Sequence, residues 1–187
     1  MLRNINNSFG SEMIPIRLII TISVITIISV FTVQGFNQYR LVRQEQMFTE
    51  SLSIVQKNIE AMVRTGQPRD INDIHSSNGT KQVHQFLLPP IITNITFGYN
   101  PSISHQQQEF YQQNAITFFS QHSGQQILWC DEQYSFIKGV YNNTKKTWMP
   151  DDSHPMLHIS GRGKVQLTFE LITDGSSLFV LIYQQIE

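Results

Sequence analysis

The chain has 187 residues, a formal net charge of −1, and charged side chains at 14% of its positions. Because the charges are few and nearly balanced, we expect neither nucleic acid as a partner nor a polybasic contact with lipid. Cys130 is the single cysteine of the sequence, which excludes an internal disulfide.

The first predicted element is a membrane-spanning helix over residues 14–36. This segment runs through Ile, Leu, Val and Phe with few polar interruptions, and about 20 helical residues cross a hydrocarbon core roughly 30 Å thick. The run is too long and too branched for a secretory signal, and no small-x-small cleavage site follows it. No second run reaches spanning length. We therefore expect a single-pass protein in contact with membrane lipid, with residues 1–13 as a short leader or cytoplasmic tail.

Beyond the span, apolar residues continue with a helical period. Phe48, Leu52, Val55 and Ile59 recur every three or four residues and share one helix face. The sequence therefore predicts an amphipathic extension over residues 37–65, which Gly and Pro end directly afterwards. A domain of the same chain would cover part of this face, and we expect parallel copies of the helix to cover the rest. These four residues are the expected assembly contacts.

Residues 66–82 are polar and rich in turn formers, and they predict a linker. Residues 83–187 predict an antiparallel, β-sandwich-like domain, so that the fold class is α+β. The clearest strand signal is the alternation over residues 164–173, which buries one face. Asp174, Gly175 and Ser176 then turn that strand into an antiparallel hairpin whose second strand, apolar on both faces, is expected to be central. The predicted strands cover residues 83–88, 91–99, 115–119, 126–130, 134–141, 156–160, 164–173 and 178–186.

The segment Phe9-Gly10-Ser11-Glu12-Met13-Ile14-Pro15 leads into the apolar run. With its apolar amino-terminal helix, its acid at the head of that helix, its amphipathic extension and its β domain, the chain resembles type IV pilin-like proteins, especially the archaeal ones. The resemblance implies that a peptidase cuts after Gly10, that Ser11 becomes the amino terminus, and that Glu12 pairs with the α-amine of a neighbouring subunit. The chain departs from the family pattern because no Lys or Arg directly precedes Gly10.

Two features bear on orientation. Arg40 and Arg43 follow the span, and by the positive-inside rule they place the β domain in the cytoplasm by a margin of about one charge. The pilin-like plan instead places the domain outside the cell, and we expect the extracytoplasmic location. N-glycosylation acceptor triplets would be relevant only if the β domain is extracytoplasmic, and one or two such triplets are expected by chance in this sequence. Asn-x-Ser/Thr triplets begin at Asn6, Asn78, Asn94 and Asn142.

Catalytic motifs are lacking in the sequence. His154 stands beside two aspartates, but the flanking prolines favour a polar turn over a metal site. Cys130 in an apolar strand is more typical of a core thiol than of a nucleophile. Residues 161–164 enter a strand, whereas a phosphate-binding loop must open a helix. We therefore expect no enzyme, no cofactor and no metal.

The expected function is that of a non-enzymatic pilin-like subunit of a surface filament or secretion apparatus. Such a subunit would assemble with copies of itself or with other pilin-like subunits through its amino-terminal helix, and it would display its β domain. The alternative is a single-pass, membrane-anchored extracytoplasmic β domain that binds a ligand or an envelope partner without polymerising. Aromatic residues in the predicted strands are either core or a binding face. They are Trp129, Tyr134, Phe136, Tyr141 and Trp148.

Overall fold

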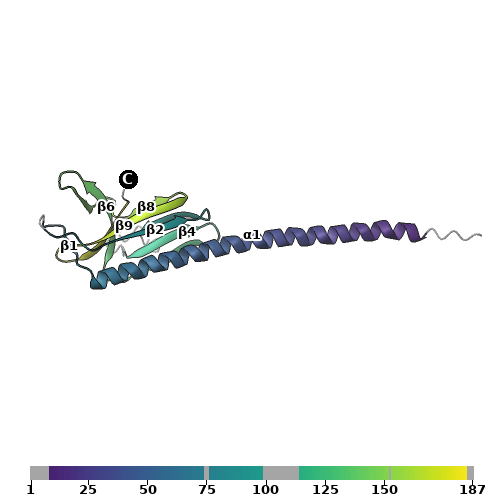
Figure 1. The fold of residues 1–187 in the computed structure, drawn as a ribbon, viewed down its shortest axis with the longest axis horizontal. Helices are drawn as coiled ribbons and strands as arrows, with labels where there is room; N and C mark the ends of the chain where they lie inside the picture. Colours follow the sequence, from purple (N-terminus) through teal and green to yellow (C-terminus); the bar gives the residue numbers. More distant parts are fainter. Residues whose placement is uncertain (1–8, 74–75, 99–113, 152, 185–187) are drawn as a thin grey trace, which may run out of the picture. The chain divides into compact units, whose positions relative to one another are not determined.

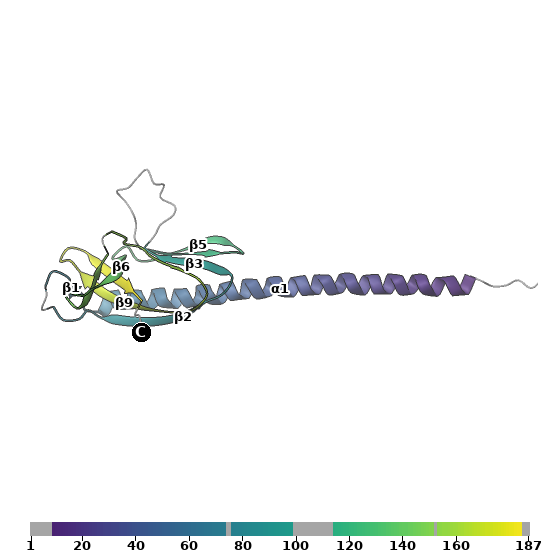
Figure 2. The ribbon, with the colours of Figure 1, turned by 90° about the horizontal axis from the view of Figure 1, so that it is seen from above.

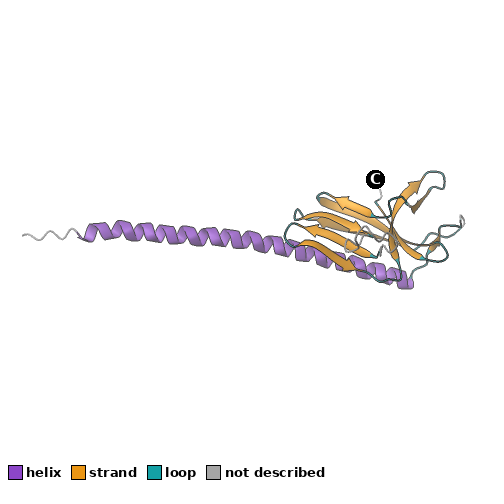
Figure 3. Cartoon of the chain, turned by 180° about the vertical axis from the view of Figure 1, so that it is seen from behind, coloured by secondary structure: helices purple, strands orange, loops and turns teal. Residues whose placement is uncertain are grey.

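The computed structural model describes residues 9–73, 76–98, 114–151 and 153–184, with side chains from residue 16 onward. The chain divides into two compact units, Met1–Val42 and Arg43–Glu187. Helix α1 (Phe9–Thr65) contributes residues to both units, and all the strands belong to the second (Figure 3).

The described part of the first unit is a stretch of helix rich in apolar residues. Every residue from Ile16 to Leu41 is exposed, and its large apolar side chains expose 43–69% of their surface. Among the described residues, α1 is the one helix that is long and apolar enough to cross a membrane. Its hydroxyl groups are satisfied within the helix, because each donates a hydrogen bond of 2.8 Å to the carbonyl four residues earlier. The donors are Thr21, Ser23, Thr26, Ser29 and Thr32.

The second unit contains two sheets. The larger has the strand order β1-β9-β10-β6-β7, with β2 also paired to β9, and the smaller has the order β5-β4-β3-β8 (Figure 1). The strands are β1 (Arg69–Asp70), β2 (Lys81–Leu88), β3 (Ile92–Phe97), β4 (Ala115–Ser120), β5 (Gly124–Trp129), β6 (Ser135–Asn142), β7 (Thr147–Pro150), β8 (Leu157–Ser160), β9 (Gly163–Thr173) and β10 (Leu178–Tyr183). The expected α+β class with a long apolar helix is thus consistent with the structure.

The sheets are not antiparallel throughout, so that part of the prediction was wrong. The predicted hairpin is confirmed, since Leu178 of β10 pairs antiparallel with Thr173 of β9. The other edge of β10 pairs in parallel with β6, and β1 pairs in parallel with β9. Strand β10 is central in its sheet, as expected. Residue alternation reports which face of a strand is buried, and it carries no information on the direction of the neighbouring strand.

The carboxy-terminal part of α1 lies in the hydrophobic core of the second unit. Phe48, Leu52, Val55, Ile59 and Met62 expose between 0 and 4% of their surface and pack in one cluster with side chains from both sheets. Figure 2 shows β2 on one side of this stretch of helix and β3 and β5 on the other. The helix therefore supplies one wall of the core.

Phe48 shows how the helix joins the two sheets. Its ring meets Phe86 of β2 and Phe118 of β4 edge to face, with centroids 6.4 Å and 5.4 Å apart. The expectation that Phe48, Leu52, Val55 and Ile59 contact other copies of the chain is corrected by this burial. These side chains are covered by the strands of their own chain, and a surface that is covered in the folded unit cannot pack against a second subunit.

Strand positions were predicted closely, with two omissions. All eight predicted strands overlap an observed strand, and the helix ends where Gly66 donates a hydrogen bond of 2.8 Å to the carbonyl of Met62. Strand β1 lies inside the predicted linker, and β7 was missed. Residues 161–162 connect β8 to β9, which belong to different sheets, so this turn is a crossing between sheets.

Candidate functional site

The proposed processing segment lies at the start of α1. Gly10, Ser11 and Glu12 fall within the first turns of the helix, but their side chains are outside the described part of the chain. Cleavage after Gly10 and pairing of Glu12 with a neighbouring amine stay predictions that rest on the resemblance.

The three predicted glycosylation acceptors in the second unit occupy different settings. Asn78 is exposed in the loop before β2, and Asn94 is half-buried in β3. Asn142 ends β6, where its Oδ1 accepts hydrogen bonds from the backbone amides of Thr144 at 2.9 Å and Lys145 at 3.0 Å. Asn142 therefore shapes the β6–β7 turn as well as opening an Asn-x-Thr triplet. Asn6 lies outside the described residues.

The aromatic residues of the strands do not form one binding face. Tyr134 and Phe136 are 2% and 0% exposed and belong to the core. Trp148 of β7 stacks on Tyr183 of β10, with ring centroids 4.2 Å apart and an angle of 11° between the planes. Trp129, 47% exposed, lies on β5 of the other sheet. Burial and cross-strand pairing thus account for most of this set.

A groove of about 610 Å³ lies at the four-stranded sheet, lined by residues of β3, β4, β5 and β8 and by the segment before β8. Asn94, Phe119 and His154 line it, together with Thr96 and His158, whose Oγ1 and Nδ1 are 3.0 Å apart. Amide, hydroxyl and imidazole groups beside an apolar ring can bind a polar ligand. Among the described residues, no three His, Cys, Asp or Glu side chains come together as a metal site.

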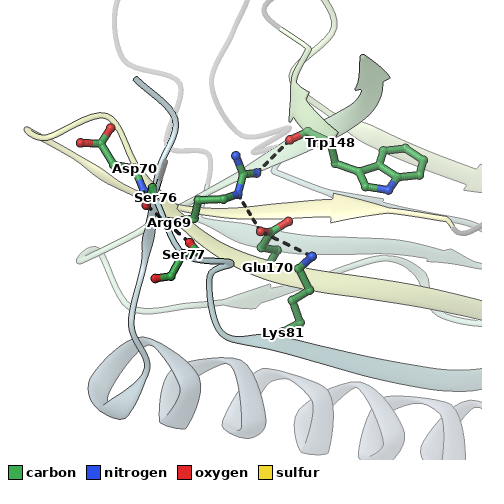
Figure 4. Close-up of polar contacts among 7 residues, drawn as sticks. All are labelled: Arg69, Asp70, Ser76, Ser77, Lys81, Trp148 and Glu170. Atoms are coloured by element: carbon green, nitrogen blue, oxygen red, sulfur yellow. Dashed lines mark hydrogen bonds and ion pairs between the residues drawn. The ribbon is translucent and has the colours of Figure 1, made fainter. Parts of the chain in front are cut away.

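The charged cluster on the larger sheet is the most highly organised polar site. Arg69 of β1 and Glu170 of β9 are 6% and 1% exposed, and Arg69 Nε donates to Glu170 Oε1 at 2.8 Å. Arg69 Nη2 donates to the carbonyl of Trp148 at 2.8 Å, and Lys81 Nζ lies 3.7 Å from Glu170 Oε1 (Figure 4). The cluster thus joins β1, β2, β7 and β9. Glu170 Oε2 has no hydrogen-bond partner among the described residues.

Sequence reasoning missed this cluster. Arg69 fell in the predicted linker, and Glu170 fell on the strand face expected to meet solvent. The available signal was that Glu170 stands directly between Phe169 and Leu171 and near the apolar Ile172, where a charged residue needs a partner if both faces are covered. The partner itself lies 101 residues away in the sequence, beyond the reach of any local pattern.

Cys130 is a protonated core thiol. The side chain is 8% exposed, and burial raises its pKa to about 11. Because the thiolate is the reactive form, this cysteine is a poor nucleophile at neutral pH. Burial also lowers the pKa of His84, whose ring lies edge-on to Phe169 at 5.7 Å between centroids.

Comparison with known proteins adds no assignment to these sites. No family model, no curated protein and no solved structure matches the chain.

Proposed function

We propose that the chain is a non-enzymatic, pilin-like subunit whose amino-terminal helix assembles with other such helices in a surface filament or secretion apparatus. Its β-sandwich-like domain is displayed outside the cell. The observation that supports this proposal is that one helix, α1, carries two different apolar surfaces. Residues 16–41 are exposed and mostly apolar, whereas the stripe from Phe48 to Met62 is built into the core of the second unit.

The two apolar surfaces lie on separate parts of α1, so assembly with other subunits and packing against the strands use different residues. The second part is already covered by the strands, so assembly must use residues 16–41, which have no cover from the chain itself. Moving apolar side chains out of water lowers the free energy, and both lipid tails and the apolar faces of similar helices can cover them. A helix that leaves the bilayer would need neighbouring helices in place of lipid.

The anchored alternative has its own support. The five Ser and Thr hydroxyls of the apolar stretch each donate a hydrogen bond to their own helix backbone, so none of them requires a partner helix. The groove at the four-stranded sheet would then be the ligand site. Under this alternative, the helix stays in the membrane and the domain binds its target as a monomer.

Cysteine cross-linking in native membranes separates the two functions. In a Cys130→Ser background, single cysteines would be placed at each position from Ile22 to Ser29, and the cells would be oxidised before electrophoresis. Assembly predicts a disulfide-linked dimer whose yield rises and falls every three to four positions, because one helix face meets its neighbour. Lys57→Cys, exposed on the second unit, is the matched control and should not form the disulfide-linked dimer. A yield of cross-linked product no higher than background at every position would favour the permanent anchor.

Two further measurements test the processing and the orientation. Amino-terminal sequencing of protein from native membranes should give a chain that starts at Ser11, whereas a chain that retains Met1 to Gly10 would refute cleavage. Protease added to intact cells should remove the second unit. Full protection in wall-stripped cells would support the cytoplasmic orientation indicated by Arg40 and Arg43.

A further inference from the structure

A small polar pocket lies beside the Arg69–Glu170 ion pair, within the second unit. It has a volume of about 200 Å³ and is lined by β1 with the loop that follows it, and by the β6–β7 turn with β7. The polar lining residues are Arg69, Asp73, Ser76, Asn78, Lys145, Lys146 and Thr147. We propose that this pocket binds an oxyanion, namely the phosphate, sulfate or carboxylate group of a ligand.

Arg69 is the first reason. The guanidinium is nine-tenths buried, and two of its nitrogens are fixed by Glu170 and by the carbonyl of Trp148. Nη1 has no hydrogen-bond partner among the described residues, and Figure 4 shows the third nitrogen pointing away from both partners. A guanidinium held rigidly with free N–H groups is prepared to bind an oxyanion, because little side-chain entropy remains to be lost.

The local charge is the second reason. Lys145 and Lys146 belong to the same lining, and Asp73 is the one acid that lines it in the part of the chain described. The negative charge of Glu170 is shared between Arg69 at 2.8 Å and Lys81 at 3.7 Å. Cations therefore exceed acids around the pocket, which favours a negatively charged ligand.

The pocket also has a fixed frame. The β6–β7 turn that carries both lysines is held by Asn142, whose Oδ1 accepts from the amides of Thr144 and Lys145. The opposite wall is held by Ser76, whose hydroxyl accepts a hydrogen bond of 3.0 Å from the amide of Asp70. A volume of about 200 Å³ is below that of sites for drug-sized ligands, which begin at roughly 300 Å³. The pocket thus suits one anionic group, with the rest of the ligand outside.

Titration of the full chain in nonionic detergent micelles tests the proposal. Trp129→Phe leaves Trp148, whose carbonyl contacts Arg69, as the fluorescent reporter. Inorganic phosphate, sodium sulfate and sodium acetate would each be titrated against chloride at constant ionic strength. We expect a saturable change in fluorescence. Saturation by phosphate and sulfate alone would assign a phosphoryl or sulfate ligand, and saturation by acetate would assign a carboxylate.

Variants locate the effect. Lys145→Gln with Lys146→Gln should weaken binding about tenfold, because two partly screened ion pairs are lost. Lys57→Gln with Lys164→Gln removes the same charge from positions that do not line the pocket, and it should leave the affinity unchanged. Arg69 is left intact, since it also neutralises Glu170. Absence of saturation with all three salts, or equal weakening by both double variants in correctly folded protein, would overturn the proposal.

Discussion

Removing one partner of the buried ion pair should cost far more stability than removing both. Arg69→Met leaves Glu170, 1% exposed, with Lys81 at 3.7 Å as its nearest cation. Glu170→Leu leaves Arg69 with the carbonyl of Trp148 as its one fixed partner. A buried charge stripped of its partner typically costs about 3–5 kcal/mol. We expect Arg69→Met near the lower end, because Lys81 compensates in part, and Glu170→Leu near the upper end.

The double variant carries the test. Arg69→Met combined with Glu170→Leu removes both desolvation penalties, so its free energy of unfolding should lie close to that of the parent chain. The coupling energy between the two positions should then exceed about 3 kcal/mol. Urea unfolding of the full chain in micelles, followed by tryptophan fluorescence, measures all three variants. Lys81→Met is the control, and because this ammonium is 39% exposed the change should stay below about 1 kcal/mol.

Additive effects would refute this reasoning. If each single variant lost less than about 1 kcal/mol and the double variant lost their sum, the pair would behave like a surface ion pair. Burial of the two charges would then contribute nothing specific to the joining of β1 to β9.

Three further outcomes follow from the core of the second unit. Leu52→Ala should lower the free energy of unfolding by about 2–5 kcal/mol in the same urea assay. Ile54→Ala is the control, because this side chain is 59% exposed, and it should lower the free energy of unfolding by less than about 0.5 kcal/mol. Equal effects of the two variants would show that Leu52 is not in the core. Gly79→Ala should lower the thermal midpoint, because an added Cβ would overlap the carbonyl oxygen of Leu171; an unchanged midpoint would show that this contact relaxes freely. Cys130, with a pKa of about 11, should react with iodoacetamide at pH 8.5 far more slowly in folded than in unfolded protein, because the folded thiol stays protonated until the pH approaches 11; equal rates would refute its burial.

The core stripe of α1 shows what the sequence could and could not predict. The spacing of Phe48, Leu52, Val55 and Ile59 identified both the helix and its buried face, because helical periodicity is a local property. The identity of the covering surface was predicted wrongly. An apolar stripe indicates that one helix face is buried, but strands of the same chain and helices of another chain can bury it equally well.

The strands divide in the same way. Those with alternating or apolar runs of six or more residues were found close to their true positions. Strand β1 has two residues, too few for a period to be recognised, and the four residues of β7 include Pro150, which is unusual in a strand. Strand β8 also has four residues, but it was predicted at residues 156–160. The pairing of β10 with β6 and of Arg69 with Glu170 joins distant segments, so neither could be read from neighbouring residues. The polar pocket depends on those pairings and was therefore invisible as well.

The position of β9 and β10 late in the chain has a consequence for biosynthesis. These two strands supply side chains to the core cluster that contains the stripe of α1, and Glu170 reaches Arg69 across 101 residues. The helix emerges from the ribosome first, so the core cluster that contains Phe48 and Leu52 stays incomplete until nearly the whole chain has been made. Folds closed by such distant contacts form slowly and expose apolar surface meanwhile. A chaperone that holds the amphipathic part of the helix during synthesis would suit this order of events, and deletion of β10 should leave the chain prone to aggregation.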